Sequence, residues 1–123
     1  MISGTVNDEL QPVVPLTLRD ASGQTRDVEA VIDTGFNGYL TLPSNLTGTL
    51  GLPWVARHQG LVADGTVHTF DVYAATVVWD GKDRLVETEI VEAQPLIGMA
   101  FLLEHDLWIR VRRSGAVEVR AIP

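Results

Sequence analysis

Apolar and polar residues alternate in short runs along most of this chain, and Gly, Asp, Asn and Pro separate the runs. A period of two places apolar side chains on one face of a β-strand, whereas a helix needs a period near 3.6. Val28, Ala30 and Ile32, for example, share one face of such a run. The pattern therefore predicts an all-β domain.

Length and composition limit the possible classes of protein. The chain has 123 residues and a formal net charge of -7, which fits one compact domain spanning residues 1–123. The absence of cysteine excludes disulfides, thiolate zinc sites and a cysteine nucleophile. Its three histidines are scattered, so we expect neither a metal site nor a cofactor.

Charge and hydropathy also bear on partners and location. The 16 acidic residues outnumber 9 basic ones, which argues against binding the phosphate backbone of nucleic acid. The first residues lack the basic start and the apolar core of a signal peptide. The longest apolar stretch, Leu96 to Leu103, is far shorter than the ~20 residues of a membrane span. We expect a soluble cytoplasmic protein that binds no membrane.

The periodicity and the turn residues predict where each element lies. A weak helical turn is expected from Ser44 to Leu50, and one short, apolar helix from Met99 to His105. Strands are expected over residues 2–6, 10–18, 27–32, 39–42, 54–63, 66–79, 84–91, 108–112 and 116–122.

The longest predicted hairpin pairs residues 54–63 with residues 66–79. Asp64-Gly65 suits a two-residue turn, because both central positions of that turn need positive φ angles. Opposed residues then have numbers that sum to 129. This register predicts the pairs Val62 with Val67, Gln59 with Phe70, and His58 with Asp71.

The tripeptide Asp33-Thr34-Gly35 is the main candidate for chemistry. It directly follows an apolar, β-branched run and precedes a short strand that ends at Pro43. Leu96-Ile97-Gly98 comes late in the chain, ahead of the predicted helix. An ordinary turn, in which the Asp accepts a backbone hydrogen bond, is the alternative interpretation of the tripeptide.

This ordered set resembles the retropepsin-like aspartic proteases. The run from Ile32 through Asp33-Thr34-Gly35-Phe36-Asn37-Gly38, followed by Leu42-Pro43, looks like the signature of their bacterial single-domain members. The resemblance covers nearly the whole chain. It implies a closed acid-protease barrel in which the long hairpin is a flap over the substrate and one short helix lies near the C-terminus.

The resemblance also implies roles for individual residues. Asp33 would be catalytic, the Thr34 hydroxyl would brace the loop, Gly35 would allow its tight turn, and Gly98 would pack closely beside it. Extended peptide or protein substrates would bind between this loop and the flap. The candidate substrate-binding residues are Phe36, Asn37, Gly38 and Ile97 beside the loop, Ala63, Asp64 and Gly65 at the flap tip, and Leu61 and Val62 as further pocket walls.

A single Asp-Thr-Gly implies a homodimer. Aspartic proteases use two carboxylates, and a second lobe does not fit within 123 residues. Asp33 from each of two copies would then meet on a two-fold axis. In this family the terminal strands commonly build the dimer sheet, which here would recruit residues 1–6 and 116–122.

Two other functions remain open from the residues alone. A non-catalytic module of the same fold could bind extended peptides or serve for dimerisation, because fold does not determine function. A small barrel could instead hold an apolar ligand in an enclosed cavity. An aspartic endopeptidase is the function that the sequence favours.

Overall fold

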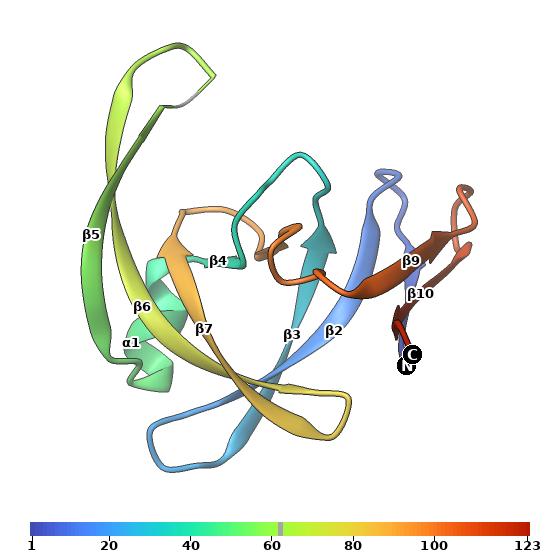
Figure 1. The fold of residues 1–123 in the computed structure, drawn as a ribbon, viewed down its shortest axis with the longest axis horizontal. Helices are drawn as coiled ribbons and strands as arrows, with labels where there is room; N and C mark the ends of the chain where they lie inside the picture. Colours follow the sequence, from blue (N-terminus) through green and yellow to red (C-terminus); the bar gives the residue numbers. More distant parts are fainter. Residues whose placement is uncertain (62) are drawn as a thin grey trace.

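The computed structural model describes residues 1–61 and 63–123. Within them the chain forms strands and one short helix, which confirms the all-β expectation (Figure 1). The elements are β1 (Ile2–Val6), β2 (Pro12–Arg19), β3 (Thr25–Ile32), β4 (Leu40–Leu42), α1 (Ser44–Leu50), β5 (Trp54–Leu61), β6 (Val67–Trp79), β7 (Lys82–Ile90), β8 (Leu96–Ile97), β9 (His105–Ile109) and β10 (Ala116–Ala121).

The apolar alternation of the sequence produces the core. On β2, Val14, Leu16 and Leu18 point inward and are fully buried. Strand β3 pairs antiparallel with β2 and adds Ala30, which lies opposite Val14. On β6 the inward face carries Ala75, Val77 and Trp79 in the same core cluster. Burial of this apolar face is the main stabilising contribution to the fold.

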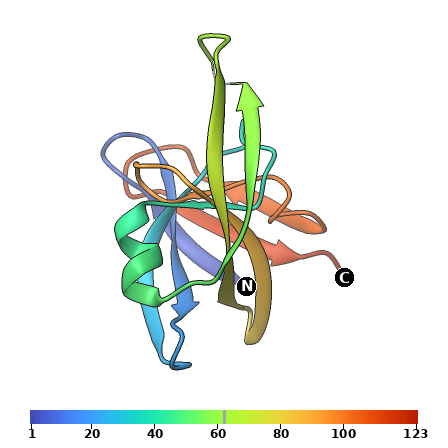
Figure 2. The same cartoon turned by 90° about the vertical axis from the view of Figure 1, so that its left-hand side faces the viewer.

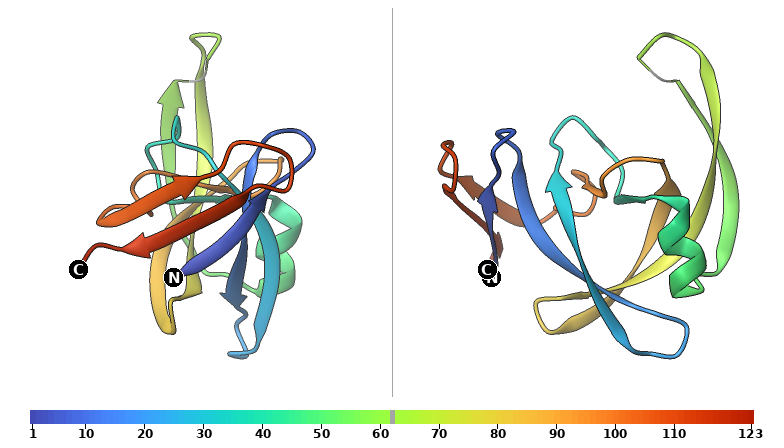
Figure 3. Two further views of the ribbon diagram at one scale, coloured as in Figure 1. Left: turned by 90° about the vertical axis from the view of Figure 1, so that its right-hand side faces the viewer. Right: turned by 180° about the vertical axis from the view of Figure 1, so that it is seen from behind.

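The strands form one strongly curved sheet and not the closed barrel that we expected. Their order is β5-β6-β7-β4-β8-β3-β2-β1-β10-β9, and a further pairing of β2 with β6 curls the sheet onto itself (Figure 1). Among the described residues the end strands β5 and β9 do not pair with each other. The sheet stays open because β5 belongs to a projecting hairpin and β9 lies outside β10 at the other end (Figure 3).

The β5–β6 hairpin has the predicted position but not the predicted register. Arg57 lies opposite Asp71 and His58 opposite Phe70, so the opposed numbers sum to 128 instead of 129. The cause is the turn, in which Gly65 has a φ of 83° whereas Asp64 is not among the residues with positive φ. A two-residue turn would need positive φ at both positions. The predicted partner of Val67, Val62, lies outside the described residues.

The helical predictions had opposite outcomes. Residues Ser44–Leu50 form α1, which ends at Gly51 in the left-handed conformation, φ 65°. The predicted helix from Met99 to His105 is wrong: residues 99–104 form turns, and His105 begins β9. Glu104 has a positive φ of 65°, which ends the turns before a regular helix can form.

In the part of the chain that the structure describes, no helix combines the length and the apolar character needed to cross a bilayer.

Candidate functional site

The Asp33 loop spans residues 33–39 and connects β3 to β4. Strand β8 lies between these two strands, parallel to β3 and antiparallel to β4. The Asp33 amide continues the β3–β8 pairing by donating to the Ile97 carbonyl at 2.9 Å. The first residue of the loop is therefore anchored at the end of a buried two-strand contact.

The segment that follows β8 fixes the rest of the loop. The amides of Gly98, Met99 and Ala100 donate to the carbonyls of Tyr39, Phe36 and Gly38, at 3.0, 2.8 and 3.1 Å respectively. Three consecutive backbone donors thus satisfy three carbonyls of the Asp33 loop. Catalytic groups have to be held in place by their surroundings. Here the backbone of residues 98–100 holds the Asp33 loop.

Gly98 is required by a close approach. A Cβ at this position would overlap the Gly38 carbonyl oxygen and come within 2.6 Å of the Phe36 ring. A Cβ on Gly38 would also come within 2.6 Å of that ring. The expectation that Gly98 packs closely against the loop agrees with this geometry. Phe36 fills the space between two glycines, so its ring supports the loop from within.

The Asp33 side chain is half-buried, and Thr34 and Gly35 are exposed. The Asp33 Oδ1 accepts the Gly35 amide at 2.9 Å, and the Asp33 carbonyl accepts the Phe36 amide at 3.2 Å. These are the hydrogen bonds of a tight Asp turn. Because one carboxylate oxygen is already held by the backbone, the orientation of the carboxylate is set before any substrate arrives.

Asp33 and Thr34 face an open hollow of about 370 Å³. Its other walls come from the β1–β2 turn, from β3 and β8, and from the end of β9. They are mainly apolar and comprise Leu10, Gln11, Pro12, Val31, Ile32, Leu96 and Ile109. A carboxylate at the edge of an apolar hollow can bind and polarise a water molecule while apolar groups of a ligand fill the remaining space.

The other sequence-predicted site residues are distributed over three places. Asn37 is exposed on the Asp33 loop, whereas Ile97 is fully buried and belongs to the core instead of a pocket surface. Ala63, Asp64 and Gly65 are exposed at the end of the β5–β6 hairpin. Leu61 is also exposed, and Val62 lies outside the described residues. The loop residues are therefore brought together, and the flap-tip residues stand apart from them.

The β5–β6 hairpin rises above the rest of the sheet as a two-stranded arm (Figure 2). It curves so that its concave side faces the Asp33 loop between β3 and β4 (Figure 1). At its end, Asp64 Oδ1 accepts the amide and the hydroxyl of Thr66, at 2.9 and 2.6 Å. These bonds lower the pKa of Asp64, because they stabilise the carboxylate.

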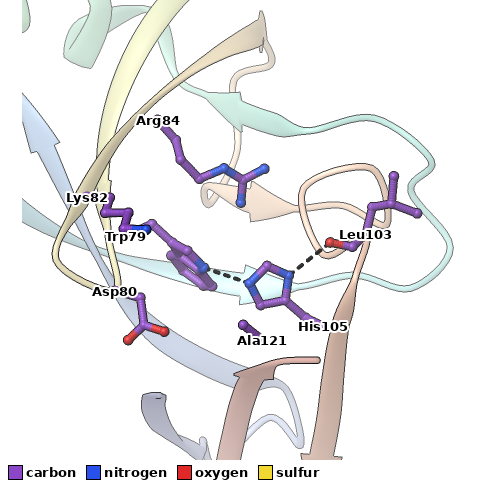
Figure 4. A pocket seen from close by; sticks show the side chains of 7 residues that line it. All are labelled: Trp79, Asp80, Lys82, Arg84, Leu103, His105 and Ala121. Atoms are coloured by element: carbon purple, nitrogen blue, oxygen red, sulfur yellow. Dashed lines mark hydrogen bonds between the residues drawn. The ribbon is translucent and has the colours of Figure 1, made fainter. Parts of the chain in front are cut away.

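A second hollow is lined by Trp79, Asp80, Lys82, Arg84, Leu103, His105 and Ala121 (Figure 4). In it the Trp79 indole N–H donates to His105 Nε2 at 3.0 Å, and His105 Nδ1 lies 3.0 Å from the Leu103 carbonyl oxygen. An indole can only donate, so Nε2 accepts and Nδ1 carries the proton. Arg84 donates to the Phe101 carbonyl at 3.1 Å. These contacts brace the segment that holds the Asp33 loop.

Sequence reasoning missed two groups of residues near the site. Leu10 lines the Asp33 hollow although its φ is 62°, a conformation that Leu rarely adopts, and nothing in the local pattern indicates it. Arg57 and Asp71 form an ion pair on the hairpin, with Arg57 Nε 3.2 Å from Asp71 Oδ1. The one-residue error in register had placed His58 opposite Asp71, which concealed this pair.

Comparisons of the chain with models of protein families, with curated proteins and with solved structures found no match. The candidate site therefore rests on the residues and geometry given above.

Proposed function

We propose that this protein is an aspartic endopeptidase that works as a homodimer, with Asp33 of each copy in one active site. The observation that carries the proposal is the position of Asp33. Its oriented, half-buried carboxylate lies at an open hollow, on a loop clamped from behind by residues 98–100. A curved hairpin stands above the same loop (Figure 1).

The chemistry needs two carboxylates close together. Two such groups a few ångströms apart cannot both ionise, and the aspartic proteases are the system from which this behaviour is known. The ionised Asp33 would take a proton from a bound water as that water attacks the peptide carbonyl. The protonated Asp33 of the other copy would then donate its proton to the leaving amine.

The second Asp33 has to come from a second copy, because the sequence contains one Asp-Thr-Gly. Thr34 and Gly35 are exposed in the single chain, where a two-fold axis beside the loop would bring them against their equivalents. The Thr34 hydroxyl could then donate to the backbone of the other loop. The exposed surface of this loop in the single chain would become the floor of the dimer's site.

The terminal strands are poorly placed for the dimer sheet that the resemblance implied. Strand β1 lies between β2 and β10, and β10 lies between β1 and β9 (Figure 3). Both strands therefore already have neighbours on both sides within one chain. Among the described residues, β9 forms the unpaired edge at this end of the sheet, and its Ile109 lines the Asp33 hollow. We therefore propose that the dimer contact involves the Asp33 loop and the adjacent end of β9.

The test is cleavage of a diverse mixture of unfolded peptides by wild type and by Asp33→Asn, from mildly acidic to neutral pH, with products identified by mass spectrometry. Asn has nearly the same shape as Asp and keeps the Gly35 hydrogen bond, but it cannot exchange the proton. Cuts made only by wild type are expected. Both proteins are first compared by circular dichroism and thermal unfolding.

Equal cleavage by the two proteins would contradict the proposal, because a contaminating protease would then be the source. No cleavage by a wild type shown to be dimeric would also contradict it. In that case a peptide-binding module of the same fold would explain the open hollow and the hairpin above it.

A further inference from the structure

The concave side of the β5–β6 hairpin is polar. Arg57, Gln59, Thr69 and Asp71 line an open hollow of about 650 Å³ on this hairpin. The cross-strand register puts Arg57 opposite Asp71 and Gln59 opposite Thr69, so all four side chains share one face.

Alternation along β6 shows which face this is. Thr69 and Asp71 have the same parity as Ala75 and Val77, which belong to the core cluster further along the strand. Val72, of the opposite parity, is also buried but lies outside that cluster. Successive side chains on a strand point to opposite faces, so the four polar residues continue the inward face. The hairpin bends toward this side, above the Asp33 loop (Figure 1). A peptide held between loop and hairpin would meet these four side chains.

An irregularity in β5 adds a fifth group to this face. The pairing shifts register between Trp54 and Ala56, which is the mark of a β-bulge. A bulge re-aims the side chains beyond it, and here it puts Trp54 on the same side as Arg57. The Trp54 indole N–H donates to Asp71 Oδ1 at 3.3 Å, the oxygen that Arg57 Nε also contacts at 3.2 Å.

Asp71 thus binds Arg57 through Nε. The two terminal nitrogens of the Arg57 guanidinium remain available to donate to another group. Within the described residues, the hydrogen bonds of Arg57 involve its Nε, and none is formed by the side chains of Gln59 and Thr69. The terminal nitrogens of Arg57 form a planar fork that suits an acceptor oxygen. The fork, an amide and a hydroxyl border one hollow.

We propose that this face, formed by Arg57, Gln59, Thr69 and Asp71, selects peptides that carry a side-chain acceptor oxygen (Gln, Glu, Asn or Asp) at the position beneath the hairpin. The inference rests on the proposed function for placing a peptide there. An apolar side chain in that position would leave the Arg57 fork and the Gln59 amide covered without partners, which is unfavourable. A side chain with an acceptor oxygen would satisfy them.

The experiment uses a synthetic peptide library in which one position at a time is fixed as Gln, Glu or Leu. We compare kcat/KM for each fixed residue in wild type, Arg57→Leu and Gln59→Leu/Thr69→Val. The matched control is Arg26→Leu, which removes the same charge from an exposed site at the start of β3, at the far end of that strand from Asp33. Thermal unfolding establishes that each variant is folded.

In wild type, kcat/KM should be about tenfold higher for Gln or Glu than for Leu at one peptide position. A hydrogen bond to a charged group contributes enough binding free energy for a ratio of about this size. Arg57→Leu should abolish this preference, and Gln59→Leu/Thr69→Val should reduce it about threefold. Arg26→Leu should leave it unchanged. If Gln is preferred as strongly as Glu, recognition is of the acceptor oxygen and not of the charge.

The failure of this inference is distinguishable from the failure of the proposed function. If wild type cuts peptides but Arg57→Leu keeps the wild-type preference at every position, the hairpin face does not select side chains and the inference is overturned. If wild type cuts nothing, binding of the same library is measured for two proteins: the Asp33→Asn variant and the double variant Asp33→Asn/Arg57→Leu. An Arg57-dependent preference in binding would then support the inference while the catalytic proposal fails, and its absence would overturn both.

Discussion

At the scale of single residues, the site depends on contacts between small groups. Phe36 was expected to line a substrate pocket, yet its ring lies against the positions where Gly38 and Gly98 would carry a Cβ. A large side chain directly after Asp-Thr-Gly is accommodated because two glycines make room for it. The residue therefore helps to shape the Asp33 loop, and its contact with substrate stays a prediction.

Gly98→Ala tests how tightly the loop is held. The added methyl group overlaps the Gly38 carbonyl oxygen, so the loop or β8 has to move, and we expect a loss of about 1–3 kcal/mol in the free energy of unfolding. Peptide cleavage should fall as well, because the loop carries Asp33. Urea denaturation measures the first effect and the library assay the second.

The control is the same substitution in α1, Gly48→Ala, where a Cβ meets nothing within 4 Å. Alanine has a higher helix propensity than glycine, so the free energy of unfolding of this variant should rise by about 0.5–1 kcal/mol. Equal stability of the two variants would show that the close approach at Gly98 is relieved without cost.

At the scale of elements, the sequence Asp-Gly occurs in two hairpins and forms a different turn in each. Asp80-Gly81 joins β6 to β7, and both residues have positive φ, 53° and 81°, as a two-residue hairpin turn requires. Asp64-Gly65 joins β5 to β6, but only Gly65 has positive φ. In the second turn Asp64 instead binds Thr66, whose hydroxyl offers an alternative partner. The following residue, not the dipeptide, distinguishes the two.

The Trp54, Asp71 and Arg57 contacts predict how the hairpin responds to acid. Hydrogen bonds from Trp54 and then Arg57, with the charge of Arg57, lower the pKa of the Asp71 carboxyl. The carboxylate is therefore favoured in the folded state. Its stabilising effect is present above its unfolded pKa of roughly 4 and is lost as the pH falls through its lower folded value.

The Trp54 indole N–H resonance, followed by NMR, reports this directly. It should stay constant from pH 7 down to about 4 and shift below that pH, as Asp71 takes up a proton. Asp71→Asn removes the titration and serves to assign it. A midpoint above the ordinary range of an Asp side chain would contradict the contacts described here.

At the scale of the whole molecule, one chain supplies half of the proposed active site. The sheet uses its own terminal strands internally, and the Asp33 loop is exposed beside the end of β9. A dimer built on these surfaces can separate without unfolding either copy. Activity then depends on association, and the concentration of the protein controls it by mass action.

The proposed dimer therefore predicts an unusual dependence on enzyme concentration. Below the dissociation constant of the dimer, the cleavage rate should rise with the square of the protein concentration, and above it linearly. Addition of excess Asp33→Asn should inhibit wild type by forming mixed dimers. Sedimentation velocity over the same concentrations checks the association. A rate that stays linear in a protein that sediments as a monomer would exclude a shared site.

Strand β9 lies at His105–Ile109 instead of the predicted residues 108–112, and β8 was not predicted. The other strands, their hairpins and the position of the Asp-Thr-Gly loop after β3 could be predicted from the residues alone. These features follow from local causes: alternation sets the face of a strand, and Gly, Asp and Pro set its ends. The close packing of Gly98 was predicted from the resemblance of Leu96-Ile97-Gly98 to the family pattern, and a Cβ at this position would overlap the Gly38 carbonyl oxygen.

The folded structure was needed to establish the open form of the sheet, the hairpin register, the turns at residues 99–104 and the polar face of the hairpin. Each depends on groups that are distant in sequence or on a backbone angle that several residues can adopt. The turns over residues 99–104 end at Glu104, whose φ is 65°, and the amides of residues 99 and 100 donate to the Asp33 loop, more than 60 positions earlier. Arg57 meets Asp71 because the turn around Gly65 moves the register by one residue. Such long-range partners have no local pattern to indicate them.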